Sequence, residues 1–251
     1  MGSPRFKELD FSEMKFTLSG GTALVDDTAK RWKAITGTGV SEAYGLTECS
    51  PAVTMNPTNG LERMGTVGQP MPGTALKCID DNGEEVAVNE RGELCVKGPQ
   101  VMKGYWNRVE ATKESFTPDG EWLCTGDVAV IDEDGFVKIV DRIKDLILVS
   151  GFNVYPNEIE DVVAGHPSVE NCAVIGVPDD KTGEAVKLYV VASDANLTAE
   201  DIKIYCKDKL TGYKLQRQIE FRDDLPMTPV GKILRRELKD EEKAKREASA
   251  A

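Results

Sequence analysis

The chain has 251 residues, of which 40% are hydrophobic and 29% charged, a globular composition with room for one large domain or two smaller ones. Its 31 basic and 43 acidic side chains give a net charge of −12, which disfavours general nucleic-acid binding because that depends on neutralising phosphates. No apolar run approaches the roughly 20 residues of a membrane-spanning helix, and the single histidine, His166, argues against a Ser-His-Asp or Cys-His mechanism.

Six cysteines are spread along the chain without a C-x-x-C pair, at positions 49, 78, 95, 124, 172 and 206. With a single histidine beside them, they do not suggest a zinc site. The first residues lack the apolar segment of a signal peptide. We therefore expect reduced thiols and a cytoplasmic location.

The first predicted element is a strand, followed by a glycine turn and a helix. Met14–Leu18 is apolar, Gly20 and Gly21 follow, and apolar residues recur at helical spacing from Leu24 to Ile35, an order typical of an α/β unit. From about residue 64 to residue 140, short strand-like runs alternate with turns such as Asn82-Gly83 and Asp134-Gly135. This alternation predicts a β-meander or a small barrel.

After Asp141 the pattern changes to that of a mixed α+β unit. We expect a strand at 146–149, a helix from Pro156, strands at 171–177 and 185–192, a helix at 198–210, a strand near 218–222 and a helical tail. The charge also shifts, from 14 basic against 23 acidic residues over 1–141 to 17 against 20 over 142–251. The predicted fold is thus α/β and α+β, with one domain over 1–141 and a smaller one over 142–251.

Several segments carry side chains that suit a nucleotide. Ser19–Thr22 before a helix could hold a phosphate on exposed N–H groups, although a simple turn explains it as well. Tyr44–Glu48 combines an aromatic ring, a glycine, a hydroxyl and a carboxylate that could hold a hard cation. Asp127, expected in a turn at the start of a strand, could accept both hydroxyls of a ribose. Taken alone, the segment 19–22 is better explained as a simple glycine turn and 44–48 as an ordinary loop with a buried tyrosine, and Asp127 could be a capping residue in a turn.

Two charged segments complete the set. Asp141–Asp145 places four charges between two apolar strands, which suits either a solvated hairpin tip or a hinge. Pro226–Arg236 is a proline- and glycine-rich loop that presents Lys232, and a lysine ammonium suits a carboxylate or an α-phosphate. A solvent-facing lysine is the simpler alternative. No P-loop and no dinucleotide-binding glycine motif is present in the sequence.

Together these segments resemble the adenylate-forming superfamily, in the same order and spacing. The similarity rests on Tyr44–Glu48, on 120–142 with its Thr125-Gly126-Asp127, on Gly151–Glu160 and on Pro226–Arg236. The stretch 119–144 is similar to the motif of fatty acyl-CoA synthetases, with Cys124 where many members have histidine. The superfamily's Ser/Thr/Gly-rich loop ending in Pro-Lys-Gly has no match here, so we expect the chain to be the C-terminal half of a longer enzyme.

The resemblance implies a long-chain fatty-acid–CoA ligase that first forms acyl-AMP from a fatty acid and Mg-ATP and then passes the acyl group to coenzyme A. It also implies a role for individual residues: Lys232 in catalysis, Gly21, Tyr44, Gly45, Thr47, Asp127 and Arg142 in nucleotide binding, Glu48 in binding Mg²⁺, Gly151 and Phe152 in binding coenzyme A, and Lys144 as the hinge. An isolated C-terminal half is expected to be inactive.

Other functions remain open on the sequence. An aryl- or medium-chain acyl-CoA ligase would share these motifs, because the acyl pocket is expected mostly outside the chain. A luciferase-like or peptide-synthetase-like adenylating domain fits the stretch 119–144 less well. A non-catalytic nucleotide-binding or docking module is the alternative from another class. Peripheral contact with the inner membrane face is a further expectation.

Overall fold

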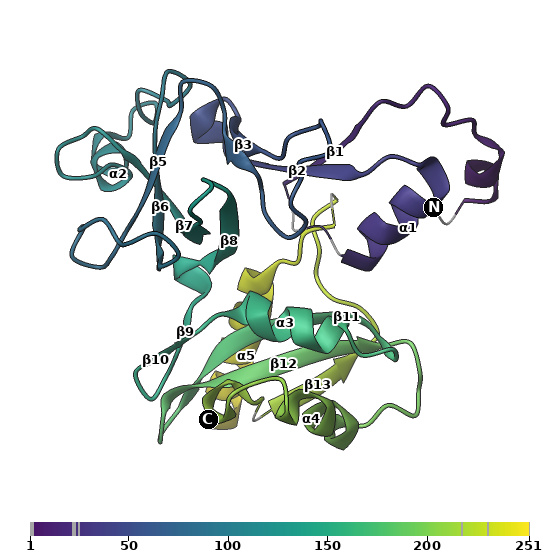
Figure 1. Ribbon diagram of the computed structural model, residues 1–251. Coiled ribbons are helices and arrows are strands. Elements are labelled where there is room, and N and C mark those ends of the chain that lie inside the picture. Colours follow the sequence, from purple (N-terminus) through teal and green to yellow (C-terminus); the bar gives the residue numbers. More distant parts are fainter. Residues whose placement is uncertain (1–2, 22–23, 25, 217, 230, 251) are drawn as a thin grey trace. The chain divides into compact units, whose positions relative to one another are not determined.

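A computed structural model of the chain describes residues 3–21, 24, 26–216, 218–229 and 231–250 (Figure 1). It divides into two compact units, Met1–Ile139 (unit 1) and Val140–Ala251 (unit 2). Each unit has its own sheets and its own core, and each is described by itself. The domain boundary predicted between residues 141 and 142 stays a prediction about how the chain folds and moves.

The first sheet of unit 1 has four strands in the order β1-β2-β3-β4. β1 and β2 are parallel, whereas β2, β3 and β4 pair antiparallel. A helix, α1, connects the two parallel strands, as a parallel connection requires. The elements are β1 (Thr17–Gly20), α1 (Asp26–Thr36), β2 (Val40–Gly45), β3 (Ala52–Met55) and β4 (Gln69–Pro70), with short 3₁₀ turns η1 (Pro4–Glu8) and η2 (Thr47–Cys49).

The second sheet of unit 1 is the predicted β-meander, with strand order β5-β6-β7-β8. Its antiparallel strands are joined by tight turns and by one longer connection that contains α2. The elements are β5 (Ala75–Ile79), β6 (Arg91–Lys97), α2 (Val109–Glu114), β7 (Leu123–Ile131) and β8 (Val137–Arg142).

A shared apolar core holds the two sheets of unit 1 together. Val53 of β3 and Cys49 of η2 pack with Val96 of β6 and Leu123 of β7, and all four side chains are almost fully buried. Tyr44, at the end of β2, packs against this cluster and against the neighbouring one on the meander. The tyrosine is therefore fixed by both sheets.

Unit 2 is built on a five-stranded sheet in which β12 is central. β11 pairs along one edge of β12, and β13 and β9 pair with it on the other side. Its elements are η3 (Ile143–Asp145), β9 (Ile147–Val149), β10 (Phe152–Val154), α3 (Pro156–Ala164), β11 (Val169–Asp179), β12 (Gly183–Ala192), α4 (Ala199–Lys207), η4 (Gly212–Lys214), β13 (Gln218–Arg222) and α5 (Arg235–Ala250).

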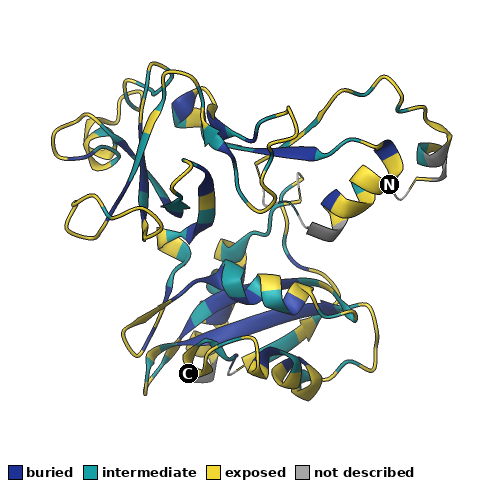
Figure 2. Cartoon of the chain, in the orientation of Figure 1, coloured by how far each residue is buried: buried dark blue, intermediate teal, exposed yellow. Residues whose placement is uncertain are grey.

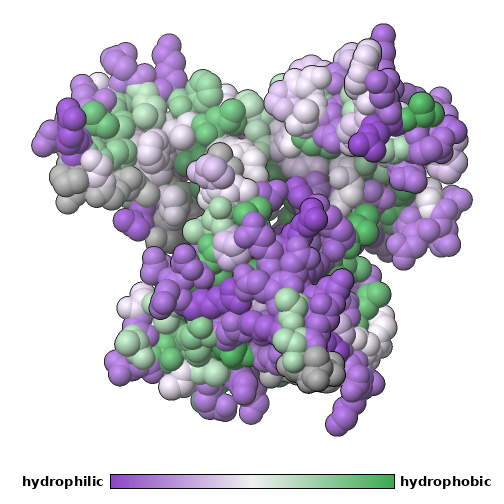
Figure 3. Space-filling model, turned by 180° about the vertical axis from the view of Figure 1, so that it is seen from behind, coloured by the Kyte–Doolittle hydropathy of each residue, from purple (hydrophilic) through white to green (hydrophobic). Residues whose placement is uncertain are grey.

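The alternation of side chains along β11 and β12 buries both faces of this sheet (Figure 2). Val174 and Leu188 point to the face covered by α3 and α4, where Ile159 and Ile202 complete the core. The opposite face contributes Ile175 and Tyr189 to a second core, in which α5 takes part through Leu238. Viewed from behind, unit 2 is covered largely by hydrophilic residues (Figure 3).

The structure confirms the α/β and α+β class, and the predicted helices and strands are found within a few residues of their expected bounds. One prediction is wrong in detail. Asp127 lies inside β7, not in a turn at the start of a strand, because β7 already begins at Leu123. The strands β2, β3, β4 and β10 and the helix α2 were not predicted. Among the described residues, no helix has the length and apolar character needed to cross a membrane.

Candidate functional site

The predicted residues of unit 1 gather first at one edge of a sheet. β1 and β2 run parallel, with Gly20 opposite Ala43, so Gly21, which follows β1, and Tyr44, near the end of β2, lie at the carboxyl ends of adjacent strands. Gly21 has a φ of +88° and is exposed, and a side chain added there would meet no atom within 4 Å. The carboxyl edge of parallel strands is where open α/β sheets bind ligands.

A short hydrogen bond joins Tyr44 to Asp127, although 83 residues separate them in the sequence. The Tyr44 hydroxyl donates to Asp127 Oδ2 at 2.5 Å. Burial, and then the charge of Asp127, raise the pKa of Tyr44 well above its usual value, so the phenol stays protonated and remains a donor. Asp127 is 8% exposed. The structure thus brings together two of the predicted nucleotide-binding residues.

Asp127 is presented by an irregularity in β7. Cys124 pairs with Cys95 and Val128 pairs with Glu93, so residues 125–127 lie opposite Leu94 alone. Gly126 has a φ of +73°, and its N–H donates to Glu93 Oε1 at 2.9 Å. Bulges of this kind redirect side chains next to functional sites. The sequence analysis did not identify Glu93. No local sequence pattern shows that a glutamate in a strand accepts a hydrogen bond from a residue 33 positions away.

Burial governs the protonation of Glu93. Removal from water raises the pKa of this carboxyl, the bond from the Gly126 N–H opposes the rise, and the nearby charge of Asp127 adds to it. The carboxyl groups of Glu93 on β6 and Asp127 on β7 are therefore near neighbours, and that of Glu93 is held by the Gly126 N–H. Asp127, which the Tyr44 hydroxyl orients, is the carboxylate that we expect a ligand with adjacent hydroxyl groups to contact.

The segment after β2 places Glu48 beside Tyr105. Thr47 and Glu48 begin η2, and the Tyr105 hydroxyl donates to Glu48 Oε1 at 2.7 Å. The Met102 N–H also donates to the Glu48 carbonyl at 2.7 Å, which ties the segment before α2 to this turn. At Gly45 a Cβ would clash with the backbone of Pro51, so only glycine fits there. Tyr105 is a second partner that the sequence analysis did not identify.

Within the described residues, no group of three or more His, Cys, Asp or Glu side chains is placed to hold a metal ion. Glu48, in η2 just after β2, offers one carboxylate near the carboxyl end of this strand. One carboxylate fits Mg²⁺ only in the case where most of its ligands are water and phosphate oxygens. The donors of unit 1 therefore fit a cation that arrives on a phosphate ligand, and they do not form a metal cage.

In unit 2, Arg142 and Lys144 lie at the start of the chain segment that enters this unit. Arg142 ends β8, and its N–H donates to Asp141 Oδ1 at 2.8 Å. Lys144 is exposed in η3, and its carbonyl accepts a bond from Lys239 Nζ at 3.3 Å. This position suits the predicted hinge, since the Lys144 side chain is left at the surface.

Gly151 lies in the turn between β9 and β10, and Phe152 is the first residue of β10. Gly151 has a φ of +82° and open space where a side chain would be. Phe152 is 57% exposed, and its ring stacks on Tyr213 with centroids 5.0 Å apart. A large apolar ring that is kept at the surface by a second ring offers a flat contact for a ligand.

A tight turn holds the loop that carries Lys232. The Lys232 N–H donates to Thr228 Oγ1 at 3.0 Å, and its carbonyl accepts from the Thr228 N–H at 2.8 Å. Met227 and Ile233 close the loop as an isolated β-bridge. Val230 lies outside the described residues. The backbone on both sides of Lys232 is thus fixed, which a freely solvated lysine would not need.

Buried charges support this loop from its C-terminal side. Arg235, at the start of α5, contacts Glu160 Oε2 at 2.5 Å and Asn157 Oδ1 at 2.7 Å. Asn157 in turn donates to Asp141 Oδ2 at 2.8 Å, and Arg235 lies 3.9 Å from Asp145. Within unit 2 the network links the Lys232 loop, α3 and the predicted hinge. The sequence shows these charges but not that they meet.

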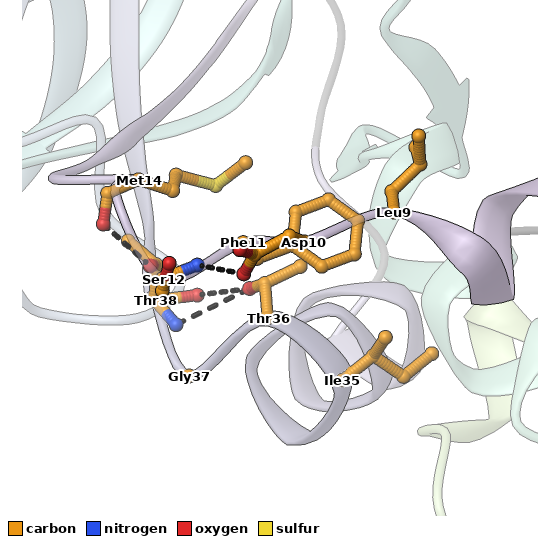
Figure 4. Close-up of a pocket in the computed structure, with 9 residues that line it drawn as sticks. All are labelled: Leu9, Asp10, Phe11, Ser12, Met14, Ile35, Thr36, Gly37 and Thr38. Atoms are coloured by element: carbon orange, nitrogen blue, oxygen red, sulfur yellow. Dashed lines mark hydrogen bonds between the residues drawn. The ribbon is translucent and has the colours of Figure 1, made fainter.

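A hollow of about 520 Å³ lies between the Leu9–Met14 segment and the end of α1 (Figure 4). Its polar groups bond to one another: Thr36 Oγ1 donates to the Thr38 carbonyl at 3.3 Å, and the Ser12 N–H donates to Asp10 Oδ1 at 2.9 Å. None of the predicted site residues lines it. We do not assign it to the site.

Two family models match the chain. A family model described as AMP-binding enzyme matches residues 1–106, and one described as AMP-binding enzyme C-terminal domain matches residues 158–232. The chain is 54% identical over 245 residues to a long-chain-fatty-acid–CoA ligase of Salmonella typhimurium. That match covers 98% of this chain but 43% of the relative, so the chain spans less than half the length of the curated protein it matches.

Two solved structures show the same fold. ATP-bound MatB from Rhodopseudomonas palustris is 38% identical, with a TM-score of 0.85, and the match covers 89% of this chain and 44% of that one. The anthranilate CoA ligase AuaEII in complex with anthranoyl-AMP is 32% identical, also with a TM-score of 0.85, over 99% of this chain and 48% of that one. Similarity to both structures extends across the two units.

Proposed function

The chain belongs to the AMP-binding enzyme family, and on this premise we propose that it works in an ATP-dependent, AMP-forming long-chain fatty-acid–CoA ligase. In the first reaction a carboxylate oxygen of the fatty acid attacks the α-phosphorus of ATP and pyrophosphate leaves. In the second, the thiol sulfur of coenzyme A attacks the acyl carbon, AMP leaves and the thiol proton is lost.

The observation that carries the proposal is the Tyr44–Asp127 pair at the carboxyl edge of β1 and β2. We propose that Gly21, Tyr44 and Gly45 lie against the adenine, and that Thr47 donates to the α-phosphate. Asp127 would accept the ribose hydroxyls, with Arg142 as the second ribose contact. A buried carboxylate whose geometry is fixed by a phenol is preorganised for such a diol.

Glu48 is the residue proposed to hold Mg²⁺, which would neutralise phosphate charge during adenylation. The Tyr105 bond to Oε1 orients the Glu48 carboxylate. A single carboxylate fits this role because magnesium in nucleotide sites commonly keeps waters and phosphate oxygens as its other ligands.

For the two chemical steps we propose different residues of unit 2. Lys232 would place its ammonium between the fatty carboxylate and the α-phosphate in the first step, where negative charge moves from one to the other. Lys144 would act as the hinge about which the 142–251 domain turns. Gly151 and Phe152 would line the path of the coenzyme A chain in the second step, where glycine leaves room for a thin ligand.

The proposal includes low activity for the chain on its own. The 251 residues contain no Ser/Thr/Gly-rich loop ending in Pro-Lys-Gly to wrap the ATP phosphates. We propose a cytoplasmic enzyme that contacts the inner membrane face peripherally, where long-chain fatty acids partition. An aryl-CoA ligase is the second candidate, and the likeness to the anthranilate CoA ligase favours it.

Separating the two half-reactions of a Lys232→Ala variant tests the proposal. The protein would be a chimera in which this chain replaces the matching part of the Salmonella typhimurium ligase. Acyl-AMP formation should fall by about 10²–10³ because a preorganised charge is lost. Thioester formation from synthetic acyl-AMP and coenzyme A should change little. Lys243→Ala, on the exposed side of α5, is the matched control and should leave both steps unchanged. Equal loss in both steps, or in neither, would refute the role of Lys232.

A further inference from the structure

Two cysteine sulfur atoms are in contact within the meander of unit 1. Cys95 of β6 and Cys124 of β7 are paired across the strands, and their Sγ atoms are 3.7 Å apart. The Cys124 N–H donates to the Ser115 carbonyl at 2.9 Å, so it does not bond to Cys95. Opposed residues without mutual backbone bonds have the closer Cα atoms, at about 4.5 Å.

This spacing permits a covalent bond. Disulfides bridge Cα atoms about 4.4–6.8 Å apart, so the expected separation of an opposed pair of this kind lies within the range. All six cysteines are free thiols in the structure. The other sulfurs have different neighbours: Cys78 Sγ donates to the Ala129 carbonyl at 3.6 Å, and Cys172 Sγ donates to the Glu160 carbonyl at 3.5 Å.

The two thiols differ in exposure. Cys95 is 0% exposed, whereas Cys124 is only half-buried. A small oxidant therefore reaches Cys124 first, and Cys95 is the nearest thiol that can react with the product. This is the arrangement of an attacking thiol beside a resolving one.

We propose that Cys95 and Cys124 are a modification site, which a hydroperoxide oxidises to a reversible intramolecular disulfide. The Cys124 thiolate attacks the terminal oxygen of the hydroperoxide, the O–O bond breaks, and the departing alkoxide (hydroxide in the case of hydrogen peroxide) takes up a proton. The Cys95 thiolate attacks the sulfur of the resulting sulfenic acid, the S–O bond breaks, and the departing hydroxide takes up a proton and leaves as water. Two thiols lose two electrons, and the peroxide gains them. A dithiol reductant reverses the change by thiol–disulfide exchange.

The bond would act on the neighbouring bulge. Cys124 immediately precedes residues 125–127, whose geometry depends on Thr125 Oγ1 donating to the Leu94 carbonyl at 2.8 Å and on the Gly126–Glu93 bond. The 3.7 Å between the two Sγ atoms must shorten to about 2.05 Å in the disulfide, and we expect the accompanying movement of Cys124 to shift the adjoining backbone that presents Asp127. The consequence, weaker nucleotide binding in the oxidised protein, rests on the proposed function, whereas the disulfide itself does not.

The rate of closure depends on pH. Burial raises the pKa of both thiols, and each is further affected by its neighbours. Because the thiolate is the nucleophile, oxidation is slow near neutral pH and accelerates by up to about tenfold per pH unit as the thiolate fraction grows.

The test is to treat the protein with hydrogen peroxide, block the remaining thiols after denaturation, and map the peptides by mass spectrometry. We expect one Cys95–Cys124 cross-link, lost on treatment with dithiothreitol, with the other four cysteines still blocked as thiols. Cys124→Ser and Cys95→Ser should abolish the cross-link. Cys78→Ser, on the adjacent strand β5, is the matched control and should retain it.

Oxidation of other cysteines ahead of this pair, or over-oxidation of Cys124 without a cross-link, would overturn the proposal, as would six intact thiols. A parallel titration of the ligase chimera with ATP separates the two claims. Loss of ATP affinity on oxidation, restored by reduction and absent in Cys124→Ser, supports the effect on Asp127. If the reduced chimera fails to bind ATP, the proposed function is wrong, whereas the cross-link is judged by the peptide map alone.

Discussion

At the scale of single residues, the most important feature of the site is that Tyr44 donates, and Asp127 accepts, the hydrogen bond between them. The phenol donates to Oδ2 and so holds the Asp127 carboxylate in one orientation, which a ligand that donates to this carboxylate would require. The sequence predicted both residues from their motifs. It could not predict Glu93 or Tyr105, because each partner lies on a different element and contributes through geometry alone.

Tyr44→Phe tests this pair at the residue scale. The variant keeps the aromatic ring but removes the hydrogen bond that orients Asp127, and we expect ATP affinity to fall by about tenfold, typical of a hydrogen bond to a charged group. Titration calorimetry on the ligase chimera measures it. Tyr205→Phe is the matched control, since this ring lies against His166 in unit 2, and should bind ATP normally. Unchanged ATP affinity in Tyr44→Phe would show that the Tyr44–Asp127 hydrogen bond does not contribute to nucleotide binding.

At the scale of elements, unit 2 depends on how α3 and α5 meet the hinge segment. The periodicity of apolar residues and Pro156 at the first helical position were enough to predict α3 and the strands beside it. β10 escaped prediction because it has three residues and pairs only with β9. The contact between Arg235 and Glu160 joins positions 75 apart, and no local pattern encodes it.

The buried charges around Arg235 should dominate the stability of this region. Arg235→Met leaves Glu160 buried without its cation, which we expect to cost about 3–5 kcal/mol. Hydrogen exchange at the Val174 amide, which donates to Glu160 Oε1 at 2.7 Å, reports the change within unit 2. Arg236→Met is the control: its side chain is 92% exposed, and the expected change is below about 0.5 kcal/mol.

The pH dependence of this variant has a defined sign. Burial already raises the pKa of Glu160, with Arg235 opposing the rise. Without Arg235 the folded-state pKa rises further above the unfolded value, so the folded form binds a proton more tightly. The destabilisation should therefore shrink as pH falls from about 7 towards about 5. If the variant loses the same free energy of unfolding at both pH values, the loss reflects changed packing, and the unpaired charge of Glu160 plays no part in it.

At the scale of the whole molecule, the chain is two units with separate cores, and β8 runs from one into the next. The pattern of apolar residues and turns changes near residue 141, which indicated two parts, because a hairpin-rich meander and a helix-covered sheet have different periodicities. The relative placement of the parts is not a property that periodicity encodes. The hinge and the domain bounds 1–141 and 142–251 therefore stay predictions.

Limited trypsin digestion tests the boundary. Ile143 and Lys144 are exposed in η3, whereas the strands around them are largely buried, so the first cut should fall after Arg142 or Lys144, or in the tail beyond Lys243. Mass spectrometry of the earliest fragments identifies the site. A first cut within 146–222 would contradict the boundary.

The central claim is that the chain serves an AMP-forming ligase, and the products of one reaction test it most directly. The chimera with the Salmonella typhimurium ligase, folded and supplied with ATP, Mg²⁺, palmitate and coenzyme A, should yield palmitoyl-CoA, AMP and pyrophosphate in equal amounts. Chromatography of the nucleotides and thioester measures all three. Formation of ADP and phosphate, or of no acyl-CoA by a chimera that binds ATP, would contradict the account.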